Sequence, residues 1–306
     1  MRVLVTGAAG FLGRSLVAEL ASNGDEVVAL VHENGLPENL KTRISHVVYG
    51  DIRDSDILRT AIAQVDAICH LAAYLPPDYE DPSFAQACLQ VNSLATLRLA
   101  QAALEKPGCR FVHLSSSNAY AYADGAVTEE GLLYPADRAT YYLASKMVGE
   151  LYVEHLRRVA GLQSVCFRIS SAYGCGMSEK SVVARFMASA RQGVPLQVWD
   201  GGIPTYDFVY VVNVVQLIAA AVRGGEPGVY NAGSGTANSV LELARAVADT
   251  YPERKIAVEV KPPLASIPAS FRALSIDKAA RMWGYRPLSL HEGLANFRER
   301  MEDRSL

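Results

Sequence analysis

The stretch Gly7-Ala8-Ala9-Gly10-Phe11-Leu12-Gly13 lies between two patterns of different period. Before it, Arg2 to Thr6 is a short apolar run that is typical of a buried strand. After it, an amphipathic pattern predicts a helix to about Asn23, and Glu26 to Val31 predicts a second strand. Strand, glycine turn, helix and strand is the context that a dinucleotide site requires.

Each glycine of this turn has a separate physical task. Gly7 permits a tight turn, Gly10 lets the backbone approach a pyrophosphate, and Gly13 lets the helix pack closely on the strand. The first helical turn then presents N–H groups and the positive end of the helix dipole. We therefore assign this turn to a cofactor; its residues are Gly7, Gly10, Phe11, Leu12 and Gly13.

Composition excludes several classes of protein. The chain has 306 residues, a formal net charge of -3 and 50% hydrophobic residues, so it can bury a large core but offers no field for nucleic acid or an anionic membrane. The longest apolar run, 211–222, is interrupted by Asn213 and Gln216 and is too short to span a bilayer. The five cysteines are scattered, which favours core residues in a reducing cytoplasm. The strand pattern at the N-terminus leaves no room for a signal peptide, and we predict no metal site.

Tyr142 and Lys146 are four residues apart in a helical pattern that opens near Pro135. On a helix this spacing places them on one face, one turn from each other. A neighbouring ammonium favours the phenolate and is expected to lower the pKa of the tyrosine. Such a pair can move a proton to or from a carbonyl or hydroxyl group. Tyr141 competes with Tyr142, but only Tyr142 has a lysine four residues later.

The glycine spacing and the Tyr-x-x-x-Lys pair together resemble the short-chain dehydrogenase/reductase superfamily. The segment from Thr6 to Gly13 is similar to its extended branch, which includes nucleotide-sugar epimerases, dehydratases and ketoreductases. The resemblance is strong to about residue 175 and looser beyond. It implies a homodimer and an NAD or NADP cofactor.

Further cofactor residues follow from this resemblance. Gly50-Asp51-Ile52 after a third strand (His46 to Tyr49) is similar to the adenine-contacting turn of the family. His70-Leu71-Ala72-Ala73 resembles the turn beneath the cofactor, and Asn92 a structural or cofactor-proximal asparagine. The residues that we assign to the cofactor here are Asp51, Ile52, Leu71, Ala72, Ala73 and Ile169, the last at the end of a sixth strand (Gln163 to Ile169).

The second strand ends in Val31-His32-Glu33, without the usual acidic residue for a ribose 2′-hydroxyl at its end. His32 could face a 2′-phosphate, and Glu33 could still bind ribose. The choice between NAD and NADP stays open, with His32 favouring NADP.

A serine strip, Ser115 to Tyr120, follows a fifth strand (Arg110 to Leu114) and resembles the catalytic strip of the family. The resemblance places the catalytic hydroxyl at Ser116, with Ser117 as the alternative. Dehydratases of the family have an Asp-Glu pair after this hydroxyl. Here Ser117 and Asn118 occupy those places, so dehydration is not expected.

The second half of the chain departs from the family at two diphosphate-binding positions. Ser171 stands where the family has an asparagine, and Tyr206 where it has an arginine. Arg272 and Arg286 are the remaining candidate phosphate partners. We assign substrate binding to five residues, which are Ser117, Asn118, Ser171, Tyr206 and Arg272.

These observations predict a Rossmann-type, doubly wound parallel sheet with a smaller, discontinuous C-terminal substrate domain. Residues 1–172 with about 206–232 form the first domain, and about 173–205 with 233–306 the second. The expected reaction moves a hydride at a sugar carbon of a nucleotide-diphosphate sugar, as a 4-epimerase or 4-ketoreductase, with Ser116, Tyr142 and Lys146 as catalytic residues. A reductase of a non-sugar carbonyl and a non-catalytic NAD(P) sensor are the alternatives.

Overall fold

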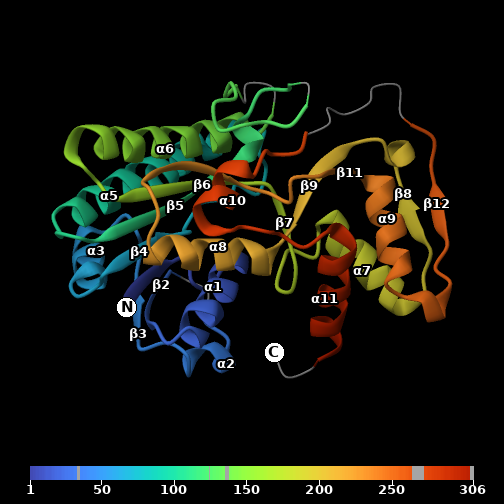
Figure 1. The fold of residues 1–306 in the computed structure, drawn as a ribbon, viewed down its shortest axis with the longest axis horizontal. Helices are drawn as coiled ribbons and strands as arrows, with labels where there is room; N and C mark the ends of the chain where they lie inside the picture. Colours follow the sequence, from blue (N-terminus) through green and yellow to red (C-terminus); the bar gives the residue numbers. More distant parts are fainter. Residues whose placement is uncertain (33–34, 124, 135–137, 264–271, 304–306) are drawn as a thin grey trace.

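The fold is organised around one seven-stranded parallel sheet (Figure 1). The computed structural model describes residues 1–32, 35–123, 125–134, 138–263 and 272–303. The strand order β10-β6-β5-β4-β1-β2-β3 reverses direction at β1 and β4, as in a doubly wound sheet, and confirms the predicted fold class. The strands are β1 (Arg2–Thr6), β2 (Glu26–Val31), β3 (His46–Tyr49), β4 (Ala67–His70), β5 (Arg110–Ser116), β6 (Ser164–Ile169) and β10 (Gly228–Ala232).

Helices cover both faces of this sheet. Figure 1 shows α3, α5 and α6 on one face and α1 and α8 on the other. Because both faces are covered, the central strands are buried, and Val3, Leu4 and Val5 of β1 have no exposed surface. The helices of this layer are α1 (Phe11–Ser22), α2 (Glu38–Lys41), α3 (Ser55–Ile62), α4 (Ala85–Cys88), α5 (Thr96–Leu104), α6 (Thr140–Ala160) and α8 (Val211–Arg223).

The remaining elements form a smaller layer beside the carboxyl ends of β5 and β6. It holds a three-stranded sheet, β11-β9-β7, and a two-stranded sheet, β12-β8. Thus β9 lies in the smaller sheet, whereas the next helix and strand, α8 and β10, return to the large one. Its elements are β7 (Ser171–Tyr173), α7 (Val182–Gln192), β8 (Leu196–Val198), β9 (Thr205–Tyr210), β11 (Ala237–Ser239), α9 (Val240–Asp249), β12 (Val258–Val260) and α11 (Leu290–Glu302). The exception is α10 (Asp277–Trp283), which packs against β10 and α8 of the large layer.

Two local features differ from the sequence prediction. The helix that carries Tyr142 and Lys146 begins at Thr140, because Ala139 before it has a left-handed backbone (φ 42°, ψ 39°) that a helix cannot include. Pro135, where we expected the helix to open, lies outside the described residues. The segment Leu89–Ala95, which contains Asn92, is a π-helical turn between α4 and α5. Such turns are frequent at functional sites.

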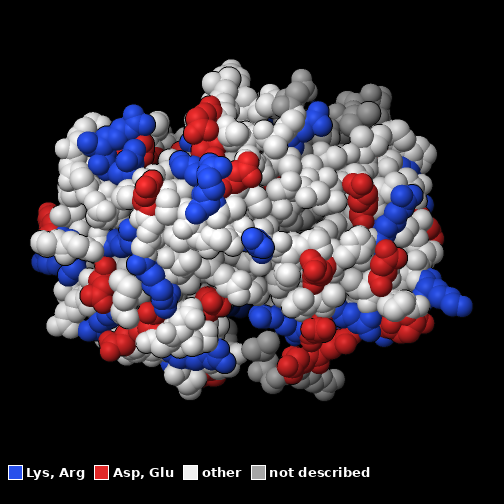
Figure 2. Space-filling model, in the orientation of Figure 1, with Lys and Arg blue, Asp and Glu red and all other residues white. Residues whose placement is uncertain are grey.

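The surface shows no segregation of charge on the face drawn in Figure 2, where Lys and Arg alternate with Asp and Glu. This is the pattern of an ordinary solvated surface. Among the described residues, no helix combines the length and the apolar character that crossing a bilayer requires.

Candidate active site

The glycine-rich turn joins β1 to α1 and leaves almost no space for side chains. Gly7 has φ +67°, and its carbonyl oxygen accepts the N–H of Gly10 at 2.9 Å. A Cβ at Gly7 would lie 2.8 Å from the nitrogen of Ala72, and one at Gly13 would lie 2.1 Å from the oxygen of Gly7. Gly10 caps α1 without a side-chain hydrogen bond, so the first-turn N–H groups face outward for an anion.

His70, at the end of β4, fixes the floor of this turn. Its Nδ1 lies 2.8 Å from the Thr6 hydroxyl, and its Nε2 lies 2.8 Å from the Thr96 hydroxyl. Thr96 donates its own proton to the carbonyl oxygen of Asn92, so it must accept from Nε2–H, and Thr6 must donate to Nδ1. Thr6 Oγ1 also accepts the N–H of Ala72 at 3.1 Å. Burial lowers the pKa of His70 to about 3, which keeps this arrangement neutral.

Tyr142 and Lys146 lie one turn apart on α6, as the spacing predicts. Lys146 is only 4% exposed. Within the described part of the chain its ammonium makes no hydrogen bond or ion pair. Burial lowers the pKa of Lys146 to about 8, although Cys166 and Glu150 oppose the change. A buried cation without a partner is costly, so this ammonium is placed to bind an oxygen-rich ligand.

The expected effect of Lys146 on Tyr142 is wrong for this structure. Burial raises the pKa of the Tyr142 phenol, and Tyr79 and Cys88 act in the same direction. The ring of Tyr79 packs edge-on against that of Tyr142, with centroids 5.6 Å apart and an interplanar angle of 82°. Helical spacing places the two groups on one face, but the loss of water around the phenol is the main cause of the shift in its pKa.

Asn92 connects α6 to the segment that follows β4. Its Oδ1 accepts the N–H of Tyr74 at 2.7 Å, and its Nδ2 donates to the carbonyl of Tyr74 at 3.0 Å and to Ser145 Oγ at 3.0 Å. Ser145 Oγ in turn donates to the carbonyl of Tyr142 at 2.7 Å. Asn92 is therefore a structural link between the catalytic helix and the loop that carries Tyr79.

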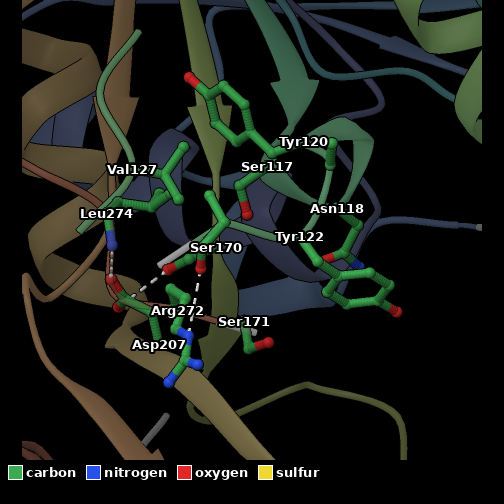
Figure 3. A pocket seen from close by; sticks show the side chains of 12 residues that line it. Ser117, Asn118, Tyr120, Tyr122, Val127, Ser170, Ser171, Asp207, Arg272 and Leu274 are labelled. Atoms are coloured by element: carbon green, nitrogen blue, oxygen red, sulfur yellow. Dashed lines mark hydrogen bonds between the residues drawn. The ribbon is translucent and has the colours of Figure 1, made fainter. Parts of the chain in front are cut away.

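A pocket opens at the carboxyl ends of β5 and β6, and we call it the central pocket (Figure 3). The empty space between its walls, which includes open solvent at the mouth, is about 420 Å³. Four of the five predicted substrate residues line it, and Tyr206 does not. The lining residues are Ser117, Asn118, Tyr120, Ala121, Tyr122, Ala123, Val127, Ser170, Ser171, Asp207, Arg272 and Leu274.

Ser116, the predicted catalytic serine, ends β5 behind this lining. Its Oγ accepts the N–H of Asn118 at 3.2 Å and so shapes the turn that presents Ser117 and Asn118 to the pocket. Arg138 holds the outer side of the same turn, donating to the carbonyl of Asn118 at 3.1 Å and stacking on the Tyr122 ring.

Asp207 fixes the opposite wall (Figure 3). Its carboxylate accepts from Ser170 Oγ at 3.2 Å, from the N–H and Oγ of Ser234 at 2.6 and 2.8 Å, and from the N–H groups of Gly235 and Leu274 at 3.3 and 3.0 Å. Burial raises the pKa of Asp207 above its usual value, and the hydrogen bonds from these donors offset only part of the rise. The carboxylate therefore positions three segments of the wall.

Tyr206 precedes Asp207 on β9, outside the lining. Burial raises the pKa of Tyr206, and Tyr122 of the lining acts in the same direction, which places the two phenols near each other.

The residues predicted for the adenosine end lie together at the carboxyl ends of β2 and β3. His32 Nε2 is 3.5 Å from Asp51 Oδ2, and Arg53 pairs with Asp51 at 2.5 Å. The hydrogen bond from Arg53 lowers the pKa of the Asp51 carboxyl, and burial partly offsets it. Glu33 lies outside the described residues. A 2′-phosphate on His32 would approach the Asp51 carboxylate, which weakens the argument for NADP.

The site residues that had not been recognised in the sequence include Tyr79, Tyr122, Ser170 and Asp207. Tyr79 and Tyr122 lie in segments without periodicity, where no pattern predicts the direction of a side chain. Ser170 could have been found, because it directly follows a buried strand at the carboxyl edge of a parallel sheet.

Comparisons with known proteins agree with this geometry. The model of the NAD dependent epimerase/dehydratase family matches residues 3–233. A UDP-glucose 4-epimerase of Mycolicibacterium smegmatis is 32% identical over 100% of both chains, and UDP-glucuronic acid decarboxylase 1 of Arabidopsis thaliana is 30% identical over 98% of this chain and 71% of its own. A solved UDP-glucuronic acid 4-epimerase of Bacillus cereus, in complex with UDP-glucuronic acid and NAD, has a TM-score of 0.81 and 25% identity over 98% of this chain and 100% of its own. The chain therefore belongs to the NAD dependent epimerase/dehydratase family, within the extended short-chain dehydrogenase/reductase superfamily.

Proposed function

We propose that this protein is an NAD-dependent enzyme that moves a hydride at C4 of a nucleotide-diphosphate sugar, as a 4-epimerase or a 4-ketoreductase. The observation that carries the proposal is the buried, unpartnered ammonium of Lys146 one helical turn from Tyr142. The relatives named above, which act on UDP-sugars, support this substrate class. The choice of NAD rests on the family and on Asp51 beside His32.

The residues present fit a dinucleotide. The turn at Gly7 and Gly13 has room for backbone only, and the uncapped start of α1 offers N–H groups to a pyrophosphate. Asp51 and Ile52 would hold the adenosine, and Leu71, Ala72, Ala73 and Ile169 the floor. NAD, when bound, accepts the hydride with its electron pair from the sugar carbon and returns it.

The protein moves the accompanying proton. Tyr142 would take the proton from the C4 hydroxyl as the hydride leaves, so that the carbon–oxygen bond becomes a carbonyl, and would give it back as the hydride returns. Lys146 would bind ribose hydroxyls and favour the phenolate once the ligands surround it. Ser116, or Ser117 in the pocket lining, would hold the reacting oxygen.

The substitution of Tyr142 by Phe tests this proposal, and the substitution of Tyr141 by Phe is its matched control. With UDP-glucose and UDP-glucuronic acid as substrates and NAD present, we expect Tyr142→Phe to lose roughly 10²- to 10⁴-fold in turnover, while Tyr141→Phe keeps it. Both should bind NADH, measured by fluorescence titration. Full turnover by Tyr142→Phe would refute the assignment.

A second candidate is a reductase of a non-sugar carbonyl, which Tyr206 and Ser171 favour. Tyr206 lacks the positive charge of the family's arginine, and Ser171 lacks the amide of its asparagine, at two positions that bind the diphosphate in the family. Thermal stabilisation by NADH but by no UDP-sugar would favour this candidate. A protein that copurifies with NAD through dialysis would instead favour the epimerase, which retains its cofactor.

We also propose that the chain has two domains, residues 1–172 with about 206–232 for NAD and the remaining residues for the sugar. We further propose that two copies of the chain form a homodimer and that the protein resides in a reducing cytoplasm. Exposed leucines on α6 and on the adjacent π-helical turn support the dimer: Leu89, Leu94 and Leu151 are 47%, 44% and 61% exposed. Sedimentation of Leu151→Glu should give a monomer, and an unchanged mass would contradict this interface. All five cysteines are free thiols, in keeping with the compartment.

A further inference from the structure

A second tyrosine, Tyr79, packs against Tyr142, the residue that the proposed function assigns to proton transfer. Its ring meets the ring of Tyr142 edge-on at 5.6 Å and 82°. This T-shaped geometry is one that aromatic pairs prefer. Tyr79 remains 38% exposed, so its outer side faces water while its inner side faces Tyr142. The Tyr79 ring therefore lies against one side of the Tyr142 ring, which is itself half-buried.

The loop that carries Tyr79 is anchored on both sides. At its start, the backbone of Tyr74 exchanges two hydrogen bonds with the Asn92 amide. At its end, Asp81 accepts the N–H of Ser83 at 2.8 Å and caps a short 3₁₀ turn (Pro82–Phe84). Between the anchors lie Leu75-Pro76-Pro77, and proline fixes φ. The place of Tyr79 is therefore set by the fold.

The same anchor holds the catalytic helix. Asn92 Nδ2 donates to Ser145 Oγ, which donates to the carbonyl of Tyr142. The loop with Tyr79 and the helical turn with Tyr142 are thus both tied to the buried side-chain amide of Asn92. This shared anchor fixes the position of one ring relative to the other. From this arrangement we infer that Tyr79 is a positioning residue, whose ring orients the Tyr142 phenol and excludes water from it during proton transfer.

This inference rests on the proposed function and identifies what controls its proton donor. Burial raises the pKa of the Tyr142 phenol, and the electrostatic interaction with Tyr79 acts in the same direction. The titratable groups around Tyr142 are Tyr79 on the loop, Cys88 on α4 and Lys146 on α6. A phenol shielded from bulk water exchanges its proton with the substrate, in either direction, instead of with solvent.

Nitration by tetranitromethane measures how well the Tyr79 ring shields Tyr142 from solvent, and it needs no substrate. Peptide mass spectrometry would follow Tyr142 in the full-length protein, in Tyr79→Ala and in Tyr79→Phe, with Tyr142→Phe to identify the signal. We expect several-fold faster nitration of Tyr142 in Tyr79→Ala and the unaltered rate in Tyr79→Phe, which keeps the ring. Tyr134, which is 63% exposed, serves as the internal reference.

Leu75→Ala is the control for a loosened loop, because it removes a 60% exposed side chain from the same segment. Equal nitration of Tyr142 with and without Tyr79 would overturn the inference, and so would a rise of the same size in Leu75→Ala or in Tyr79→Phe. Where UDP-sugars turn over, Tyr79→Ala should lower kcat more than it raises KM, with Phe restoring kcat. A fully active Tyr142→Phe would refute the proposed function but leave the nitration result standing.

Discussion

The two ends of the candidate site, which the proposed function assigns to the nucleotide and to the sugar, differ in the atoms that form their walls. Around Gly7 and Gly13 the wall is backbone, so close that an added Cβ would meet other main-chain atoms at 2.1 to 3.0 Å. Around the central pocket the wall is side chains, including Tyr122 and Ser171, which can be exchanged without moving the chain. Because side chains are exchanged more easily than backbone, the glycine turn keeps the spacing that the family resemblance implies, whereas the pocket has Ser171 where that resemblance implies an asparagine.

The largest effect is expected from a substitution at the nucleotide end. Gly13→Ala places a Cβ 2.1 Å from the oxygen of Gly7 and 2.8 Å from Cα of Ala8, and neither can move without shifting β1 or α1. We expect a loss of about 3 kcal/mol or more in the free energy of unfolding, together with loss of NADH binding. Urea denaturation and fluorescence titration measure the two effects.

Gly24→Ala is the matched control. Gly24 has φ +79° but nothing within 4 Å, so alanine there meets backbone strain without a clash. We expect a loss of only about 1–2 kcal/mol, the cost of a left-handed residue, with NADH binding unchanged. If the two variants lost equal stability, close packing of the backbone would not be what defines the nucleotide end.

An intermediate effect is expected at the sugar end. Asp207→Ala removes the acceptor of the N–H groups of Ser234, Gly235 and Leu274. Because each unsatisfied buried group costs about 1–3 kcal/mol, we expect a loss of about 3 kcal/mol. Asp207→Asn keeps one acceptor oxygen and should lose less. The Kd for NADH should stay the same in both variants.

Hydrogen exchange locates this effect. The amides of Ser234 and Leu274 should lose protection in Asp207→Ala, while those of the parallel sheet, such as Val5, keep it. Uniform loss across both regions would mean that the two ends unfold as one unit and would remove the contrast between them.

The strands of the parallel sheet and the glycine turn at the nucleotide end are predicted well by the sequence. The bounds expected for β1, β2 and β3 agree with the structure, because glycine or polar residues interrupt each apolar run. The carboxyl ends of parallel strands meet at one edge, so the order of motifs also predicts which residues gather there. Physical rules of period and turn are sufficient for this half.

The rest depends on features that a local pattern does not contain. The spacing of Tyr142 and Lys146 gives their shared face, yet the pKa of the phenol is raised chiefly by burial in the folded chain, with Tyr79, sixty-three positions away in the chain, acting in the same direction. The left-handed Ala139 and the π-helical turn at Asn92 depend on tertiary contacts. The pairing of Asp207 with Leu274 joins distant segments.

The smallest expected effect concerns two stacked imidazoles inside the nucleotide half. His70 and His113 have ring centroids 5.2 Å apart, and both are fully buried. His70 has a hydroxyl on each ring nitrogen, whereas neither nitrogen of His113 has a hydrogen-bond partner. Burial lowers the pKa of both rings, to about 3 for His70 and well below 6.5 for His113.

The sign of the pH dependence follows from these shifts. Below about pH 6.5 the unfolded chain takes up protons that the folded chain refuses, so stability is complete above that pH and falls as the pH decreases. His113→Phe removes one such group and should reduce this slope by up to about 1.4 kcal/mol per pH unit. At pH 7.5 it should cost nothing or stabilise by about 1 kcal/mol, since an unsatisfied polar group is lost. His70→Phe should reduce the acid slope equally but destabilise at pH 7.5, because the hydroxyls of Thr6 and Thr96 lose their partner. Urea denaturation between pH 5 and pH 7.5 separates the two, and an unchanged acid slope in His113→Phe would mean that a buried water already satisfies that ring.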